Sequence, residues 1–169
     1  MAAAELIFPV HCLDAVETDS APLVEVALTN NTRLSVAFDD AVGTLKYRNG
    51  KFTVPSDIDG SGTVTFRAWV AAATADSAKE FRLAVDLLPL GDSDGMDTAY
   101  SGTEDSGDVA CDTTQDDLML VEWTETVTNL GWSANDMVMF RISRIGILSG
   151  TELVGDLYWD LFSIEIPLT

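Results

Sequence analysis

Nucleophilic chemistry has few candidates in this sequence. Its one histidine, His11, is next to Cys12, and a histidine is the usual base that activates a cysteine or serine. Adjacent side chains of an extended strand point to opposite faces, so this pair cannot form a nucleophile–base unit if the segment is a strand. Neither a phosphate-binding glycine loop nor a His-Glu-x-x-His motif occurs. We therefore expect no catalytic residues and a protein that is not an enzyme.

Metal binding has one patterned candidate, the segment Asp92-Ser-Asp-Gly-Met-Asp97. Aspartates alternating with turn residues suit Ca²⁺, which takes about six to eight oxygen ligands from carboxylates and carbonyls. The segment does not complete a calcium loop of the kind that ends in a closing glutamate. Two interpretations stay open: a calcium site at Asp92, Asp94 and Asp97, or a solvated turn. No other cofactor is expected.

Aromatic side chains raise a third kind of chemistry, the stacking of sugar rings. Exposed aromatics on a sheet would form such a platform, whereas the same residues on the inner face would pack the core. The candidates are Trp69, Trp123, Trp132, Trp159, Tyr47, Tyr100 and Tyr158. Trp69 and Trp123 fall on faces shared with threonine and charged residues, so we expect them to be exposed or packed against another subunit. For the aromatic set as a whole, a core or interface role is favoured over a sugar platform.

The net charge of −19 excludes two classes of partner. A nucleic-acid-binding protein neutralises phosphates with clustered lysine and arginine, and here none occurs between Arg82 and Arg141. Anionic membranes repel such a chain as well. Cys12 and Cys111 lie far apart and are expected to be reduced, with a disulfide between them as the alternative.

Alternation of apolar and polar residues indicates that β-strands position these groups. In the clearest case, residues 63–70, Val64, Phe66, Ala68 and Val70 share one face. Similar patterns cover 6–13, 23–28, 33–38, 51–54, 79–87, 118–128, 137–147 and 162–166. Asn49-Gly50 is typical of a two-residue hairpin turn. The pattern predicts an all-β, antiparallel two-sheet sandwich of jelly-roll type with about eight to ten strands.

Two segments interrupt this pattern. Residues 91–117 are polar and long for a sandwich loop, so we expect an exposed acidic excursion. The alanines of 71–78 allow at most one helical turn.

Several motifs carry a resemblance to a known family. They are Val36–Ala41, Phe52–Trp69, the small-residue stretch Ala71–Ser77, Phe81–Leu87, Val121–Thr128, Asp136–Arg144, Leu153–Leu157 and Phe162–Ile166. Over about residues 35 to 169, the chain resembles a family of small β-sandwich virion proteins of tailed bacteriophages. The resemblance implies a sandwich domain over residues 35–169, an N-terminal arm or edge strands over residues 1–34, and a structural role on the particle.

On this basis we expect a capsid decoration or cement protein on the head surface, made in the host cytoplasm. Its partners would be the major capsid protein and two further copies in a homotrimer, with no nucleic acid and no membrane. The expected interface residues are Leu6, Ile7, Phe8, Val10, Trp69 and Trp132. The alternatives are a neck or tail component and, from another class, a carbohydrate-binding module with an aromatic platform.

Overall fold

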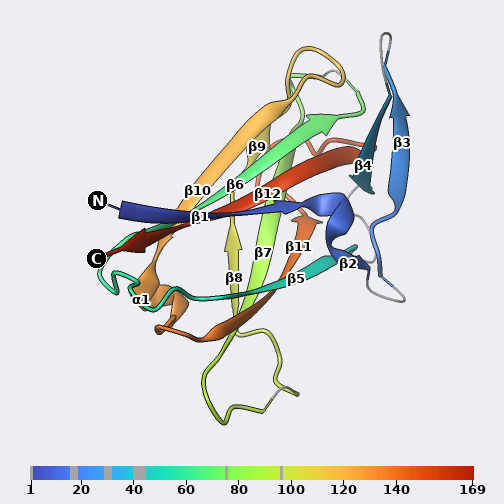
Figure 1. Cartoon of the computed structure of the whole chain (residues 1–169). Coiled ribbons are helices and arrows are strands. Elements are labelled where there is room, and N and C mark those ends of the chain that lie inside the picture. The colour runs from blue at the N-terminus through green and yellow to red at the C-terminus, as the bar shows by residue number, and fades with distance from the viewer. Residues whose placement is uncertain (1, 16–18, 29–31, 40–44, 75, 96) are drawn as a thin grey trace.

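Twelve strands form two antiparallel sheets that pack face to face (Figure 1). The computed structural model describes residues 2–15, 19–28, 32–39, 45–74, 76–95 and 97–169. The strands are β1 (Ala2–Pro9), β2 (Asp14–Ala15), β3 (Leu23–Ala27), β4 (Thr32–Phe38), β5 (Arg48–Thr53), β6 (Thr63–Ala72), β7 (Glu80–Leu90), β8 (Gly102–Asp105), β9 (Val109–Ala110), β10 (Met119–Thr126), β11 (Met137–Ile145) and β12 (Leu157–Leu168). Two short helices are η1 (Val10–Cys12) and α1 (Val127–Leu130). The predicted all-β sandwich is confirmed.

We call the sheet with order β10-β6-β12-β4-β3, in which β1 also pairs with β12, sheet A. Sheet B has the order β2-β5-β11-β7-β8, and β9 also pairs with β7. In Figure 1, β1, β6 and β12 cross over β7 and β11 of the other sheet. Within the described residues, no helix is long and apolar enough to cross a membrane.

Alternation along each central strand determines which side chains enter the core. On β6 the predicted inward set, Val64, Phe66, Ala68 and Val70, is fully buried. On β12 a bulge between Trp159 and Leu161 shifts the register against β6. The extra residue lets both Trp159 and Phe162 point inward, which simple alternation does not allow.

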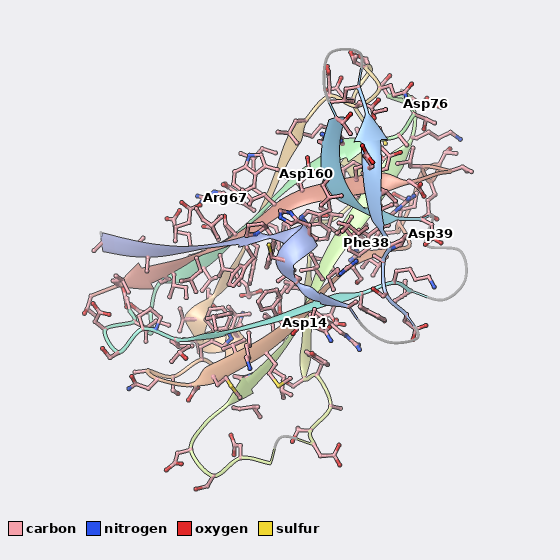
Figure 2. The ribbon with its side chains drawn as sticks, turned by 45° about the vertical axis from the view of Figure 1, so that its right-hand side comes forward. Asp14, Phe38, Asp39, Arg67, Asp76 and Asp160 are labelled. Atoms are coloured by element: carbon pink, nitrogen blue, oxygen red, sulfur yellow. The ribbon has the colours of Figure 1, made fainter. Side chains whose placement is uncertain are left out.

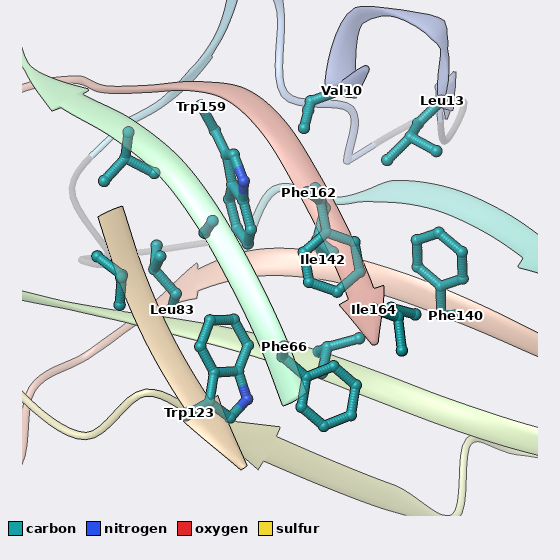
Figure 3. Packing of buried hydrophobic residues seen from close by; sticks show 14 of the residues in the cluster. Val10, Leu13, Phe66, Leu83, Trp123, Phe140, Ile142, Trp159, Phe162 and Ile164 are labelled. Carbon is teal, nitrogen blue, oxygen red and sulfur yellow. The ribbon is translucent and has the colours of Figure 1, made fainter. Parts of the chain in front are cut away.

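Aromatic rings from both sheets meet around Phe162 (Figure 3). Its ring centroid lies 5.6 Å from that of Phe140 on sheet B and 5.9 Å from that of Trp159 on its own strand. Trp123 lies 6.3 Å away and stacks on Phe66. Trp123 therefore packs the core and is 8% exposed, so the prediction that it lies at the surface was wrong.

Asn49-Gly50 does not form the predicted hairpin turn, because both residues lie inside β5 opposite β11. The glycine serves packing instead. A Cβ atom at Gly50 would lie 2.3 Å from Cζ of Phe140, whose ring occupies that space. The prediction was wrong because a turn signal and a close-packing glycine are identical in the sequence.

The region 91–117 also differs from the prediction. Gly102–Asp105 and Val109–Ala110 form β8 and β9, which pair with β7, so only part of the region is an exposed loop. The expected helical turn at 71–78 is absent from its described part, where Ala71 and Ala72 end β6. The α-helix is instead α1, where Thr126 accepts a hydrogen bond from the Asn129 amide and Gly131 ends the helix at φ 68°.

Strands from the first 34 residues pair within the sandwich. β1 pairs along β12 and brings the two chain ends side by side, β2 lies at the edge of sheet B, and β3 lies at the edge of sheet A. The buried Arg48 holds this region, since its guanidinium donates to the carbonyls of Ala21 and Leu13. Burial lowers the pKa of Arg48.

Candidate functional site

Arg141 is the central side chain on the outer face of sheet B. It belongs to β11, between β5 and β7, and its cross-strand neighbours are Asn49 and Asp86. The alternation of β11 places Phe140 and Ile142 in the core and turns Arg141 outward. Its Nε atom donates a hydrogen bond to Oδ2 of Asp86 at 2.5 Å. The arginine is therefore fixed at the middle of the sheet.

Two tyrosine rings contact the Arg141 guanidinium. Its Cζ atom lies 4.3 Å from the ring centroid of Tyr47 and 4.6 Å from that of Tyr100. Cation–π contacts of this kind contribute roughly 0.5–2 kcal/mol each, depending on desolvation. Burial raises the pKa of Tyr100, and the charge of Arg141 opposes this rise. Both tyrosines are half-buried, so their rings border the solvent.

The chain segments that carry the tyrosines are anchored on both sides. Tyr47 immediately precedes β5, and its amide donates to the carbonyl of Asp19 at 2.7 Å. Tyr100 precedes β8, where the Ser101 amide donates to the carbonyl of Leu87. Three segments distant in sequence thus meet in one Tyr47–Arg141–Tyr100 stack.

Asp86 orients the arginine and is itself held in place. It is 8% exposed, and its second carboxylate oxygen accepts a hydrogen bond from the hydroxyl of Thr103 on β8. A buried carboxylate that binds both an arginine and a hydroxyl is largely satisfied by these contacts. Asp86 consequently compensates the charge of Arg141.

Polar and sulfur-containing side chains surround the stack. Lys51 on β5 is exposed and faces the half-buried Met139 across the strand pair. Oδ1 of Asn49 is enclosed and has no hydrogen-bond partner among the described residues. Leaving a buried acceptor unpaired costs about 1–3 kcal/mol, so a donor that the described residues do not supply would stabilise this amide.

The outer face of sheet A is different in character. Trp69, half-buried on β6, lies between Leu120 of β10 and Leu161 of β12 in one cross-strand row. Leu120 is 55% exposed. Beside this row, Arg67 bonds three glutamates: Nε to Glu122 at 2.7 Å, and Nη1 to Glu165 at 2.6 Å and to Glu5 at 3.5 Å.

The hydrogen bond to Glu165, followed by that to Glu122, raises the pKa of Arg67. Figure 2 shows Arg67 and Asp160 on the side of sheet A that faces away from sheet B. Asp160 is the extra residue of the β12 bulge and pairs with Arg33 at 3.1 Å. Four carboxylates and two arginines thus occupy this face.

The predicted interface residues do not share one surface. Val10 and Trp132 are buried in the core, and Leu6 and Phe8 pack against it from β1. Ile7 and Trp69 remain on the outer face of sheet A, Ile7 with 57% exposure. Leu6, Phe8 and Trp69 are half-buried, so the six side chains differ in accessibility and face different sides of the sandwich.

The predicted calcium ligands Asp92, Asp94 and Asp97 lie exposed on the loop between β7 and β8. Asp94 accepts a hydrogen bond from the Gly91 amide at 2.8 Å, which stabilises the turn. Over the described part of the chain, no three or more His, Cys, Asp or Glu side chains gather to hold a metal ion. The two cysteines are free, and Cys111 is buried, which raises its pKa.

The same loop contains a Gly-x-Ser-x-Gly pattern, Gly91 to Gly95, with Ser93 at φ 73°. In hydrolases this pattern marks a nucleophile on a strand-to-helix turn. Here no helix follows it in the described residues before β8. His11 is exposed on η1. The local geometry is that of a tight turn.

The face around Arg141 was only partly predictable. Tyr47 and Tyr100 were named as aromatic candidates, whereas Arg141 and Asp86 were not recognised. One signal was present: an arginine alternating with Phe140 and Ile142 must face away from the core. Its pairing with Asp86 depends on the strand register, which the sequence does not reveal.

No protein-family model and no curated protein matches the chain. Among solved structures, it is similar to a xylan-binding module, CBM15, at 12% identity and a TM-score of 0.51, covering 98% of this chain and 97% of that one. A family 35 carbohydrate binding module from Clostridium thermocellum aligns with 10% identity, a TM-score of 0.50, and 95% and 97% coverage. At these identities the likeness establishes the fold alone.

No finding bears on the bacteriophage resemblance, the capsid partner or the trimer. The virion role and the absence of catalytic activity therefore stay predictions.

Proposed function

We propose that the chain is a carbohydrate-binding module that holds a glycan on the outer face of sheet B. The observation that carries this proposal is the Tyr47–Arg141–Tyr100 stack on an open sheet face. Tyrosine combines an apolar ring with a polar tip, and therefore suits pyranose rings, which present C–H groups on their faces and hydroxyls at their edges.

The polar groups beside the rings supply the second half of sugar recognition. A guanidinium donates directional hydrogen bonds to oxygen acceptors, and an anchored one loses little conformational entropy on binding. Arg141 is anchored by Asp86 and by both rings. The face is therefore largely organised before a ligand arrives.

The fold supports the same assignment. The chain aligns over nearly its whole length with a protein described as a xylan-binding module and with a second carbohydrate binding module. A shared sandwich does not by itself imply a shared ligand, so the weight rests on the side chains of the face.

The test is titration of the purified chain with neutral polysaccharides, among them xylan, hydroxyethyl cellulose and mannan, by calorimetry and affinity electrophoresis. We expect binding to at least one. Tyr100→Ala should weaken it at least tenfold, by about 1.4 kcal/mol, because one wall of the stack is lost. The matched control Trp69→Ala removes an aromatic from the opposite face and should leave the affinity unchanged.

Absence of binding to every polysaccharide at millimolar sugar would overturn the proposal. Loss of binding in Trp69→Ala but not in Tyr100→Ala would place the site on sheet A instead. Thermal unfolding of both variants, followed by circular dichroism, verifies that each remains folded.

A further inference from the structure

The free edge of Arg141 determines what kind of ligand the face accepts. Nε is occupied by Asp86, whereas Nη1 and Nη2 form no hydrogen bond with a described residue. The Arg141 side chain is 33% exposed, and neither of these atoms is enclosed. The two terminal N–H groups are therefore available to a ligand as an end-on fork.

Such a fork matches either a carboxylate or two neighbouring hydroxyl oxygens. The charges around the fork decide whether it suits an acidic or an uncharged ligand. Arg141 is already paired with Asp86, and Arg82 on the same face is paired with Asp105 at 2.5 Å. The exposed Lys51 is offset by the exposed Asp14, which pairs across the strands with Asn49. The charges of these six side chains thus sum to zero.

The surroundings of the face are negative. The loop that leads from β7 to Tyr100 carries Asp92, Asp94 and Asp97, all exposed, and the whole chain has a net charge of −19. At physiological ionic strength these charges act over about 8 Å. An anionic glycan would be repelled on approach and would find no uncompensated cation pair at the stack.

Asn49 provides a second polar group beside the fork. Its Oδ1 atom has no hydrogen-bond partner among the described residues, and Asn49 lies directly across from Arg141 on β5. Rotation of the amide toward a bound sugar would give this acceptor a hydroxyl donor. The arginine fork donates and the amide accepts, which is the complement of a pair of hydroxyl groups.

We propose that the ligand is an uncharged glycan, and that the Arg141 fork together with the Asn49 amide reads adjacent hydroxyls on one sugar residue. The proposal rests on the proposed function and specifies its ligand class. Arg141 and Asn49 are then determinants of specificity, and Asp86 is a positioning residue that also cancels the charge of Arg141.

The experiment compares matched neutral and acidic polysaccharides: hydroxyethyl cellulose with carboxymethyl cellulose, and unsubstituted xylan with glucuronoxylan. Calorimetric titrations are made at 20 mM and 500 mM NaCl. We expect neutral affinity to change less than twofold with salt, and acidic affinity to be at least tenfold lower at 20 mM NaCl. Preference for the acidic member, with affinity falling as salt rises, would overturn the inference while leaving the proposed function intact. Absence of binding to all four and to mannan refutes the proposed function itself.

Substitutions at Arg141 and Asn49 test whether these side chains bind the glycan. Arg141→Lys keeps the charge but loses the fork, so neutral binding should fall at least tenfold. Asn49→Ala should reduce it about fivefold, a difference of about 1 kcal/mol. The control Lys51→Ala removes an exposed cation of the same face and should change neutral affinity less than twofold. A large loss of neutral-glycan affinity in Lys51→Ala, or unchanged affinity in Arg141→Lys, contradicts the inference.

Asp86→Asn gives a readout that a purely structural role would not produce. It leaves the arginine charge uncompensated, so the ratio of acidic to neutral affinity should rise at least threefold. An unchanged ratio in a folded variant would show that charge cancellation by Asp86 does not determine the ligand class.

Discussion

The two outer faces of the sandwich surround an arginine in different ways. On sheet A, Arg67 meets three glutamates and no aromatic ring contacts its guanidinium among the described residues. On sheet B, Arg141 meets a single buried aspartate and two tyrosine rings. The first arrangement holds more negative charge than it neutralises, whereas the second is balanced.

This difference separates a charge network from a binding platform. Carboxylates around Arg67 are 37–50% exposed, so water competes for every contact and the network contributes modestly to stability. Two rings lie within 4.6 Å of the Arg141 guanidinium, and its Nη1 and Nη2 atoms keep free donors. Aromatic contacts thus fix an arginine without consuming all its donors, and that is the property a ligand-binding arginine needs.

The largest loss of stability is expected at Gly50, which lies beneath the outer face of sheet B. Gly50→Ala places a methyl group 2.3 Å from Phe140 Cζ, and overpacking of this kind costs about 1–3 kcal/mol of unfolding free energy. Urea denaturation measures it. Gly60→Ala is the control, since an added Cβ there meets nothing within 4 Å. Equal stability of the two variants would show that β5 and β11 separate easily, and that the sheet B face is less rigid than the comparison requires.

The next largest loss of stability is expected in the charge network around Arg67 on sheet A. Arg67→Ala leaves three glutamates close together, and we expect a loss of about 0.5–1 kcal/mol at low salt. Salt should reduce this loss, because the repelling carboxylates are exposed and screened. Arg67→Lys keeps the charge and should lose less. Denaturation at 20 mM and 500 mM NaCl provides the measurement, and a salt-independent loss would mean that Arg67 acts through packing.

Comparison of sequence and structure explains why the core was easier to predict than the site. Alternation is a local property, so the inward set on β6 could be read from residues 63–70. The β12 bulge could not, and Trp159 enters the core only because of it. Trp123 was misplaced although alternation turns it away from its exposed neighbours Glu122 and Thr124, and it stacks on Phe66 in the core.

The candidate site depends on information of longer range. Tyr47, Asp86, Tyr100 and Arg141 come together only when the order β5-β11-β7-β8 and its registers are known. A glycine in a hairpin signal and a glycine under a phenylalanine ring are indistinguishable until that register is given. Residue types could therefore suggest an aromatic platform, but they could not indicate which aromatic residues form it.

Acid should weaken the ion pair between Arg82 and Asp105 on the sheet B face. The hydrogen bond from Arg82, above all, lowers the pKa of Asp105 below its ordinary value of 3.8. A depressed folded-state pKa contributes stability above the unfolded value and loses it as pH falls through the folded one. Asp105→Asn should thus be less stable than the parent at pH 7, by about 0.5 kcal/mol. The gap should close in acid, and a gap that persists at pH 2 would contradict the assigned cause.

The smallest effect is expected where the edges of the two sheets approach each other, at Glu104 of β8. Burial first, then the charges of Glu125 and Asp105, raise the pKa of Glu104 above 4.5. A raised pKa favours the folded state below the unfolded value, and this contribution is lost as pH rises through the folded one. Glu104→Gln should therefore be slightly more stable than the parent at pH 7 and equal to it near pH 3. Denaturation at both pH values measures the difference, and Glu125→Gln should produce part of the same gain because it removes the repelling charge from sheet A. If Glu104→Gln instead destabilises at pH 7, the carboxylate has a favourable partner there, and the excess of negative charge would not extend from sheet A to this edge of sheet B.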